Sequence, residues 1–355
     1  MPIGITKRDY SLIGLDAKLA EERGLANAEW YSCKIPRPRL KELMQRRDGP
    51  AIRDTLIWFA ALIIWGTLGY LTWGTWWALP CFVVYGVLYG TSSDSRWHES
   101  GHRTAFKTMW MNDVLYEIAS FMVGRESVPW RWSHTRHHTD TIIVGRDPEI
   151  AVPRPPDLLG LALDFFRLKS GPKEFANMVR HCFGWLTPAE ASYIPDEERH
   201  KVYRNGRIYI LIYAALITWA ITIHSILPLM YIGLPVFYGA WLGVIFAATN
   251  HAGLAEDVLD HRLNSRTLYM NPIFRFLYWE MNYHIEHHMF PMVPYHALSR
   301  LHDELKADMP KPYSGLWEVY REMIPTIIRE VKEPTYFVRR QLPGTAKDVS
   351  SLEPA

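Results

Sequence analysis

The stretch from Thr55 to Thr91, TLIWFAALIIWGTLGYLTWGTWWALPCFVVYGVLYGT, decides the fold. It contains no Lys, Arg, Asp or Glu. An α-helix needs about 20 apolar residues to cross the hydrocarbon core of a bilayer, so this stretch is long enough for two crossings. A turn-like Trp-Gly-Thr sequence around Gly74 divides it. We therefore predict two membrane-spanning helices, over residues 55–73 and 76–92, joined by a tight turn.

A second stretch without charged side chains runs from Ile208 to Asn250. Pro228 is its expected break, because proline does not continue a helix. The pattern predicts spans over residues 208–226 and 229–249. The alternative is a pair of buried hairpins in a large soluble protein, but soluble cores rarely exclude charge twice over about 40 residues. We expect four spans arranged as two hairpins.

The basic residues predict the orientation of these spans. All 39 Lys and Arg lie outside the two apolar stretches, and short cytoplasmic segments of membrane proteins carry the excess of basic residues. Both termini and the segment 96–207 are therefore expected in the cytoplasm. The predicted fold class is an all-α integral membrane protein, whose four transmembrane helices carry a cytoplasmic helical cap that holds a site for two metals.

Composition divides the 355 residues into three parts. Residues 1–54 form a polar, Arg-rich cytoplasmic segment without a signal-peptide pattern. Residues 55–342 are expected to form a single membrane domain. The last residues, 343–355, are poor in large apolar side chains, which predicts a disordered tail.

The overall charge and the cysteine count exclude several classes of protein. A formal net charge of +2 gives no electrostatic basis for nucleic acid as a partner. Three widely spaced cysteines do not build a disulfide framework, a zinc ribbon or an iron–sulfur cluster. The surplus of histidine, 15 residues, is more informative.

Eight histidines fall into three short clusters. Residues i and i+4 of a helix share a face, and residues i, i+3 and i+4 form one patch, so each cluster can present its imidazoles in one direction. Imidazole is the commonest neutral metal ligand and suits iron, zinc, copper and nickel. Eight imidazoles exceed the needs of one metal ion, which predicts two. The clusters are His98 and His102; His134, His137 and His138; and His284, His287 and His288.

The local sequences around these clusters, HESGHRTAF from His98 and NYHIEHHMFPMVP from Asn282, carry a family resemblance. The pattern HxxxH, HxxHH and HxxHH around four spans resembles the membrane fatty acid desaturase/hydroxylase superfamily of di-iron oxygenases. The resemblance covers about residues 55–302. Within the superfamily, the chain is most similar to bacterial hydrocarbon oxygenases associated with rhizopine catabolism, which implies a bacterial inner membrane.

The resemblance implies two iron ions that activate dioxygen, held by the eight clustered histidines and by His251, which follows the fourth span. Carboxylates near the clusters are expected to accept hydrogen bonds from ligand imidazoles and so to set their tautomers. Asp147 and Glu149 are the first candidates, and Asp140 and Glu286 are the others.

The implied activity is desaturation or hydroxylation of an unactivated C–H position in a lipid-like or hydrocarbon-like substrate, whose identity the sequence leaves open. The electrons are expected from a separate ferredoxin, Rieske-type ferredoxin or rubredoxin with its reductase, because the chain has no Gly-rich dinucleotide motif and no cysteine cluster. Basic residues could steer an acidic donor or could follow the positive-inside bias alone. They are Arg103, Lys107, Arg125, Arg131 and Arg136.

Two other functions compete with this interpretation. His98, Glu99 and His102 also spell HExxH, the motif of zinc proteases, in which the glutamate is a general base. That reading leaves six clustered histidines without a role. A non-catalytic metal-binding or haem-binding electron-transfer protein would place single histidines within the spans, and only His224 falls there.

Overall fold

The computed structural model describes residues 8–343, and helices make up its regular structure. This part of the chain contains no β-strand and only two isolated bridges, which join Thr267 to Tyr283 and Leu268 to Tyr313. The prediction of an all-α protein is confirmed. Nearly all of the predicted tail, 343–355, lies outside the described residues.

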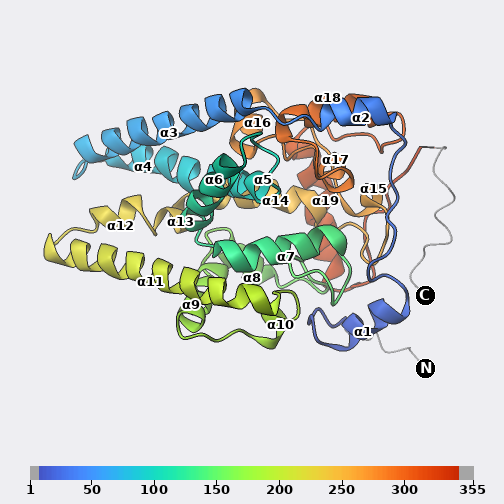
Figure 1. Ribbon diagram of the computed structural model, residues 1–355, viewed down its shortest axis with the longest axis horizontal. Coiled ribbons are helices and arrows are strands. Elements are labelled where there is room, and N and C mark those ends of the chain that lie inside the picture. Colours follow the sequence, from blue (N-terminus) through green and yellow to red (C-terminus); the bar gives the residue numbers. More distant parts are fainter. Residues whose placement is uncertain (1–7, 344–355) are drawn as a thin grey trace.

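Two long helices dominate the molecule, α3 (Asp48–Leu71) and α11 (Arg199–Thr222), each of 24 residues. They run along the upper and lower edges of the left half of Figure 1. Both are long and apolar enough to cross a membrane, since 24 residues span ~36 Å. They contain most of the predicted first and third spans but begin earlier, in charged sequence that continues each helix toward the rest of the molecule.

The chain returns from α3 through three consecutive helical segments. These are α4 (Ala78–Gly86), the π-helical turn η1 (Val87–Thr91) and α5 (Ser92–Gly101). The π-turn lies at the end of the predicted second span, and the Leu88 carbonyl there accepts a 2.8 Å hydrogen bond from the Trp58 indole. The apolar stretch therefore leads directly into the helix that carries the first histidine cluster.

The return from α11 is more broken than predicted. In place of one span over 229–249 there are three short helices, α12 (Leu227–Tyr231), α13 (Pro235–Tyr238) and α14 (Trp241–His251). Prolines near the starts of α12 and α13 favour new helix starts, and Gly233 between them has a φ of +97°. We call the helices from α3 to η1 and from α11 to α13 the stalk.

The remaining helices form a cap, most of which lies toward the other end of the molecule, with α9 beside α11 (Figure 1). Here α6 packs against α5, α9 packs against α11, and α17 packs against α18. The cap comprises α5 and α14 with α1 (Leu15–Glu22), α2 (Arg37–Leu43), α6 (Met109–Met122), α7 (Ser127–Thr139), α8 (Leu158–Asp164), α9 (Ser170–Cys182), α10 (Pro188–Ala191), η2 (Asp196–Glu198), α15 (His261–Asn264), α16 (Pro272–Tyr278), α17 (His284–Met289), α18 (Tyr295–Leu305) and α19 (Leu316–Glu330).

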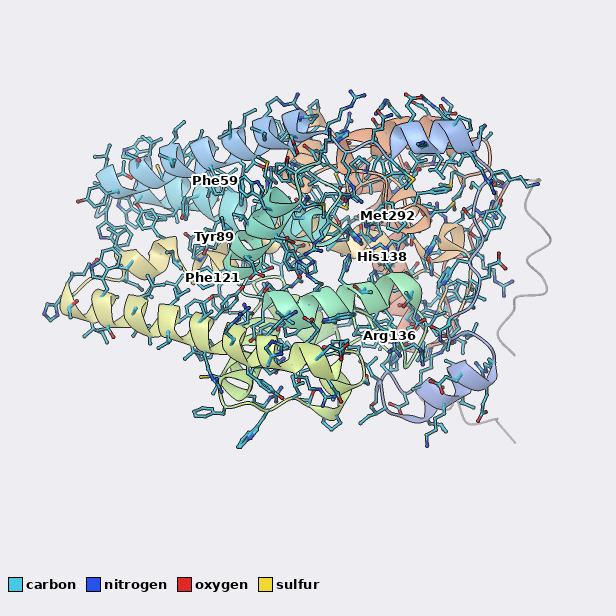
Figure 2. The ribbon with its side chains drawn as sticks, viewed as in Figure 1. Phe59, Tyr89, Phe121, Arg136, His138 and Met292 are labelled. Atoms are coloured by element: carbon cyan, nitrogen blue, oxygen red, sulfur yellow. The ribbon has the colours of Figure 1, made fainter. Side chains whose placement is uncertain are left out.

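The stalk is apolar inside and outside. Aromatic side chains such as Tyr89 fill the space between its helices (Figure 2). Its outward residues are also apolar: Ile63 is 68% exposed, Leu211 68% and Trp76, at the turn, 90%. A soluble protein rarely exposes so large a contiguous apolar surface, whereas helices that face lipid do.

Arg96 fixes the junction between stalk and cap. Its side chain is fully buried, and its guanidinium lies 4.8 Å from the centre of the Trp58 ring and 4.9 Å from that of the Trp279 ring. The guanidinium also donates a hydrogen bond to the Leu277 carbonyl at the end of α16. A buried guanidinium needs such partners because desolvation of an unpaired charge is costly. The contacts hold α5 against α16, two residues before His98.

Candidate metal centre

The structure brings all nine predicted histidines together in two adjacent groups. Within each group, one ring nitrogen from every histidine lies within 4.8 Å of all the others. Eight of the residues come from the four helices α5, α7, α14 and α17, and His102 directly follows α5. The first histidine group is His98, His102, His134, His138 and His287, and the second histidine group is His137, His251, His284 and His288.

The helical repeat explains how the predicted clusters divide between the groups. His134 and His138 are four residues apart and share a face of α7, so they enter the same group. His137 lies about 100° around the helix from His138 and enters the other group. On α17, His284 and His288 likewise stay together, while His287 joins the first group. Two helices thus contribute to both groups.

Ring nitrogens converge at close range in the first histidine group. The Nε2 atoms of His98 and His287 are 2.7 Å apart, and His134 Nε2 lies 3.1 Å from that of His102 and 3.2 Å from that of His138. One Nε2 can share only one proton with a neighbour, so most of these lone pairs have no hydrogen to accept. A metal ion satisfies such a set.

The second histidine group repeats this arrangement. Its Nε2–Nε2 distances are 2.9 Å from His284 to His251 and 3.0 Å from His284 to His288. The Nδ1 atom of His251 lies 2.8 Å from the carbonyl of Asn264, which requires a proton on Nδ1. The lone pair of His251 Nε2 therefore faces the group.

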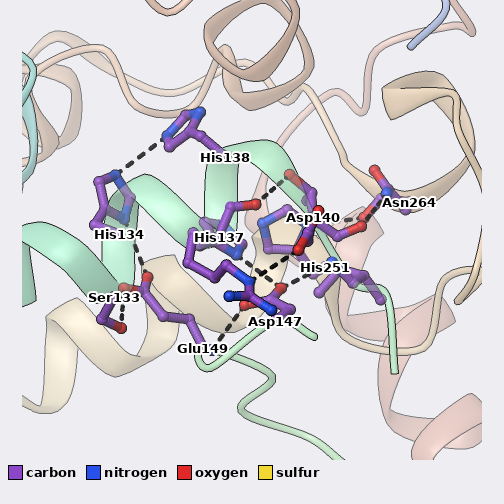
Figure 3. A network of polar contacts seen from close by, with 12 residues as sticks. Ser133, His134, His137, His138, Asp140, Asp147, Glu149, His251 and Asn264 are labelled. Atoms are coloured by element: carbon purple, nitrogen blue, oxygen red, sulfur yellow. Dashed lines mark hydrogen bonds and ion pairs between the residues drawn. The ribbon is translucent and has the colours of Figure 1, made fainter. Parts of the chain in front are cut away.

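Two carboxylates contact histidines of the two groups from outside, as Figure 3 shows. Asp147 Oδ2 lies 2.8 Å from His137 Nδ1, and Glu149 Oε2 lies 3.1 Å from His134 Nδ1. Each contact places a proton on Nδ1 and turns Nε2 inward, as expected for carboxylates that orient metal ligands.

The other two predicted carboxylates have different partners. Asp140 accepts hydrogen bonds from Arg136 at 2.9 Å and Arg146 at 3.0 Å. Glu286 points away from its neighbouring histidines, because its oxygens bond Thr267 and His302, each at 2.5 Å. The expectation that Asp140 and Glu286 bond imidazoles of the clusters directly is therefore corrected. Asp140 bonds two arginines, and Glu286 bonds Thr267 and His302.

Burial and mutual repulsion favour neutral imidazoles in the two groups. Desolvation and then neighbouring histidines lower the pKa well below its usual value for seven of the nine residues: His98, His102, His138, His251, His284, His287 and His288. The pKa of His137 is raised instead, because the charge of Asp147 and its hydrogen bond outweigh desolvation. Neutral imidazole is the form that binds a metal ion.

Glu99 does not occupy the position of a protease base. Its side chain is fully buried, and one of its oxygens accepts hydrogen bonds from the Thr104 hydroxyl at 2.7 Å and from the Tyr295 backbone N–H at 3.0 Å. Burial raises the pKa of Glu99 to about 7. The glutamate connects α5 to the start of α18.

Sequence reasoning missed His261 and His302. The buried His261 ring lies 5.1 Å from that of His288 and stacks on Trp30 at 4.2 Å, so it covers the second histidine group. His302 bonds Glu286 on α17, the helix that carries three of the nine histidines. Both are single histidines outside any cluster, and only their tertiary contacts distinguish them.

Most of the basic residues expected to steer an electron donor have carboxylate neighbours. Arg103 bonds Asp113 at 2.9 Å, Arg125 bonds Asp94 at 2.6 Å, and Arg136 bonds Asp140. These pairs lower the positive potential that an acidic partner would meet.

Comparison with known proteins agrees with this geometry. The model of the family described as fatty acid desaturase matches residues 74–320. The chain is 22% identical over 295 residues to a Delta(12)-acyl-lipid-desaturase of Punica granatum, covering 73% of the chain and 74% of that relative. It is 25% identical to the Delta(5) fatty acid desaturase fat-4 of Caenorhabditis elegans, covering 62% of the chain and 55% of the relative. It is also 25% identical to fatty acid desaturase 3 of Homo sapiens, covering 58% of the chain. The chain spans about half the length of the nematode and human proteins.

Proposed function

The chain belongs to the fatty acid desaturase family. We propose that it is a membrane-bound di-iron oxygenase that uses dioxygen to desaturate or hydroxylate an unactivated C–H position. The family and its relatives identify a desaturase-like oxidoreductase. The observation that carries the di-iron proposal is the convergence of nine imidazoles into two groups. Two separate nitrogen donor sets suit two metal ions.

The residues present fit iron. Imidazole is a suitable iron ligand, and the first and second histidine groups would each hold one ion. When bound, the two irons would supply the dioxygen chemistry that removes hydrogen from the C–H bond. The protein supplies orientation: Asp147 and Glu149 fix the tautomers of His137 and His134, and the Asn264 carbonyl fixes that of His251.

The N-terminal segment would keep water away from the second histidine group. Trp30 stacks on His261, and its indole donates to the Thr139 carbonyl at the end of α7. The next residue, Tyr31, donates its backbone N–H to the Leu259 carbonyl. Exclusion of water protects a reactive centre from side reactions.

We propose that four segments span the membrane: α3, α4 with η1, α11, and α12 and α13 together with most of α14. The rest of the cap would face the cytoplasm of a bacterium. The apolar outer surfaces of α3 and α11 support this placement. Exposed apolar residues of the cap near α8 and α9, such as Leu159, Phe166 and Trp185, would lie at the membrane surface.

We assign the electrons to a separate ferredoxin, Rieske-type ferredoxin or rubredoxin with its reductase. The three cysteines lie in different parts of the fold and would not hold an iron–sulfur cluster together: Cys33 in the N-terminal segment, Cys81 in α4 and Cys182 at the end of α9. The substrate is proposed to be an apolar or amphiphilic molecule. A rhizopine-related role stays a prediction.

The competing functions fit less well. A zinc protease would need Glu99 beside its metal, but that carboxylate bonds Thr104 and Tyr295. It would also leave the second histidine group without a role. Haem ligation needs histidines that face one another across the stalk, whereas both histidine groups are built from cap helices.

Metal analysis and product analysis test this function together. We expect purified protein to bind two irons per chain and, with a ferredoxin and reductase, to consume dioxygen. His137→Ala and His287→Ala, one in each group, should lose iron and activity together. His200→Ala is the matched control, because His200 is an exposed histidine of α11 outside both groups.

Mass spectrometry under labelled dioxygen then separates the two reactions. Label in the product indicates hydroxylation, and loss of two hydrogens without label indicates desaturation. Stoichiometric zinc or haem in place of iron would contradict the proposal, as would full turnover by both alanine variants.

A further inference from the structure

Thr141 places a buried hydroxyl between two histidines of the second histidine group. It follows the end of α7 by two residues, and its side chain is fully buried. The hydroxyl donates a 2.7 Å hydrogen bond to the His137 carbonyl and lies 3.2 Å from His288 Nδ1. A hydroxyl has one hydrogen, and a carbonyl only accepts. The hydroxyl therefore gives its hydrogen to the His137 carbonyl and accepts from His288, which places the proton of that imidazole on Nδ1.

This tautomer of His288 suits metal binding. In a neutral imidazole one ring nitrogen carries the proton and the other keeps a lone pair, so a proton on Nδ1 leaves the lone pair on Nε2. His288 Nε2 lies inside the second histidine group, 3.0 Å from His284 Nε2. The Thr141 hydroxyl therefore does for His288 what the Asp147 carboxylate does for His137.

Asn264 connects Thr141 to a third histidine of the same group. Its side-chain amide donates a 3.0 Å hydrogen bond to the Thr141 carbonyl, and its own backbone carbonyl lies 2.8 Å from His251 Nδ1 (Figure 3). The turn after α7 is thereby joined to α14 and α17. Three of the four histidines of this group have a partner at Nδ1, whereas the buried Nδ1 of His284 has none among the described residues.

The backbone beside Thr141 is held in a strained conformation. Ile142 has a φ of +56°, which a β-branched residue rarely adopts. Its N–H donates to Asp147 Oδ2 at 2.7 Å, and its carbonyl accepts from the Asp257 N–H at 3.0 Å. Such strain persists only where the surrounding structure fixes the residue. The chain is therefore held on both sides of this peptide, and the position of the Thr141 hydroxyl is held with it.

We propose that Thr141 is a positioning residue of the second histidine group, whose hydroxyl keeps the proton of His288 on Nδ1 and directs Nε2 toward the metal ion. The proposal rests on the proposed function, because it takes this group to hold one of the two irons. Without the hydroxyl, the proton of neutral His288 is free to move to Nε2, and that tautomer has no lone pair for the ion. The effect is confined to the second iron, because the hydrogen bonds of Thr141 reach His137, His288 and Asn264.

Variants that keep or remove the hydroxyl test this role through iron retention against a chelator. Thr141→Val and Thr141→Ala both lack the hydroxyl but differ in volume, whereas Thr141→Ser keeps it. We expect the valine and alanine variants to bind one of the two irons about tenfold or more weakly, because the partner of a ligand imidazole is lost. Thr141→Ser should retain both irons. Thr326→Val is the matched control, because Thr326 is also buried and its hydroxyl also bonds the carbonyl four residues earlier, at 2.8 Å.

Mössbauer spectra of the iron-loaded protein identify the iron that is lost, without any turnover. Asp147→Asn perturbs His137 in the second histidine group, and Glu149→Gln perturbs His134 in the first. We expect Thr141→Val to diminish the signal that Asp147→Asn diminishes and to retain the signal that Glu149→Gln diminishes. A residue that only stabilises the fold would affect both signals equally.

The two proposals fail in different ways. Absence of iron from the parent protein contradicts the proposed function. If the parent protein holds two irons, the role of Thr141 is overturned when the valine and alanine variants retain both, when Thr141→Ser loses iron as they do, or when Thr326→Val does. Equal loss of both signals, or failure of both hydroxyl-free variants to fold, would likewise make Thr141 a structural residue only.

Discussion

Asp147 shows how one side chain can orient a histidine of the proposed metal centre. It is buried, and besides His137 it accepts hydrogen bonds from the backbone N–H groups of Ile142 and Glu149 at 2.7 Å each. These backbone bonds fix the position of the carboxylate independently of its contact with the His137 imidazole. The turn after α7 therefore determines the direction of His137 Nε2.

We predict that Asp147→Asn weakens iron binding about 10- to 100-fold, because the amide orients His137 poorly and lowers its basicity. Iron retention against a chelator measures the effect. Asp140→Asn is the control, because Asp140 is an equally buried carboxylate of the same segment that bonds arginines. Equal iron loss in the two variants would show that Asp147 acts through folding alone.

At the scale of elements, the two returning segments of the stalk meet at paired glycines. A Cβ atom on Gly239 would lie 1.9 Å from the backbone oxygen of Gly86, a distance that no side-chain movement relieves. The close approach places η1 beside α13 and α14. It thereby joins α5 and α14, which both carry histidines, at their stalk ends.

We predict that Gly239→Ala destabilises the protein by about 1–3 kcal/mol or more, because overpacking forces the backbones apart. Gly243→Ala is the control: its Cβ would be 3.4 Å from Thr91, an ordinary contact. Thermal unfolding in detergent measures both. A Gly239→Ala protein as stable as Gly243→Ala would contradict this account of the contact.

A buried ionic cluster joins α7, α9 and α10. His181 bonds Glu126 at 2.5 Å and lies 3.2 Å from Glu190. Burial opposes the charge of His181, but the two carboxylates outweigh it and raise its pKa to about 9. The protonated imidazole therefore stabilises the folded cap.

This stabilisation depends on pH. The protonated His181 contributes its full stabilisation of the folded state below pH 6.5, the usual pKa of histidine in an unfolded chain. This stabilisation is lost as the pH rises through the folded-state pKa of about 9. We predict a fall in melting temperature between pH 6.5 and 9 that disappears in His181→Gln. If the melting temperatures of the parent protein and of His181→Gln changed with pH in the same way, groups other than His181 would cause the pH dependence of stability.

At the scale of the whole molecule, the exposed apolar surface is on the stalk, whereas the two histidine groups are in the cap. The turn after α3 lies at one end of the molecule, and α7 and α17, which carry six of the nine histidines, lie toward the other (Figure 1). This polarity agrees with an outward turn and an inward metal centre.

We predict that Gly74→Cys is labelled by a membrane-impermeant thiol reagent from outside intact cells. Glu304→Cys, on the exposed side of α18, should be labelled only after the cells are opened. Cys182→Ser is the background, because Cys33 and Cys81 are buried. The reverse labelling pattern would invert the proposed orientation.

Much of the site could be predicted because its signals are local. The spacing of His134, His137 and His138 indicates a ligand patch on a helix, whatever the rest of the chain does. The apolar stretches similarly indicate α3 and α11. The broken return over 227–251 was not predicted, because its interruptions depend on packing against η1 as much as on Pro228 and Gly233.

The helical class, the two apolar stretches and the eight clustered histidines could be predicted from the chain alone, because periodicity and charge exclusion are properties of neighbouring residues, and the family resemblance added His251. How the histidines divide between the two groups depends on the tertiary structure: His137 is separated from His134 and His138, and His287 is separated from His284 and His288. The tertiary structure also decided that Asp147 reaches an imidazole while Glu286 turns away. These outcomes depend on how helices distant in sequence pack, which local patterns do not encode.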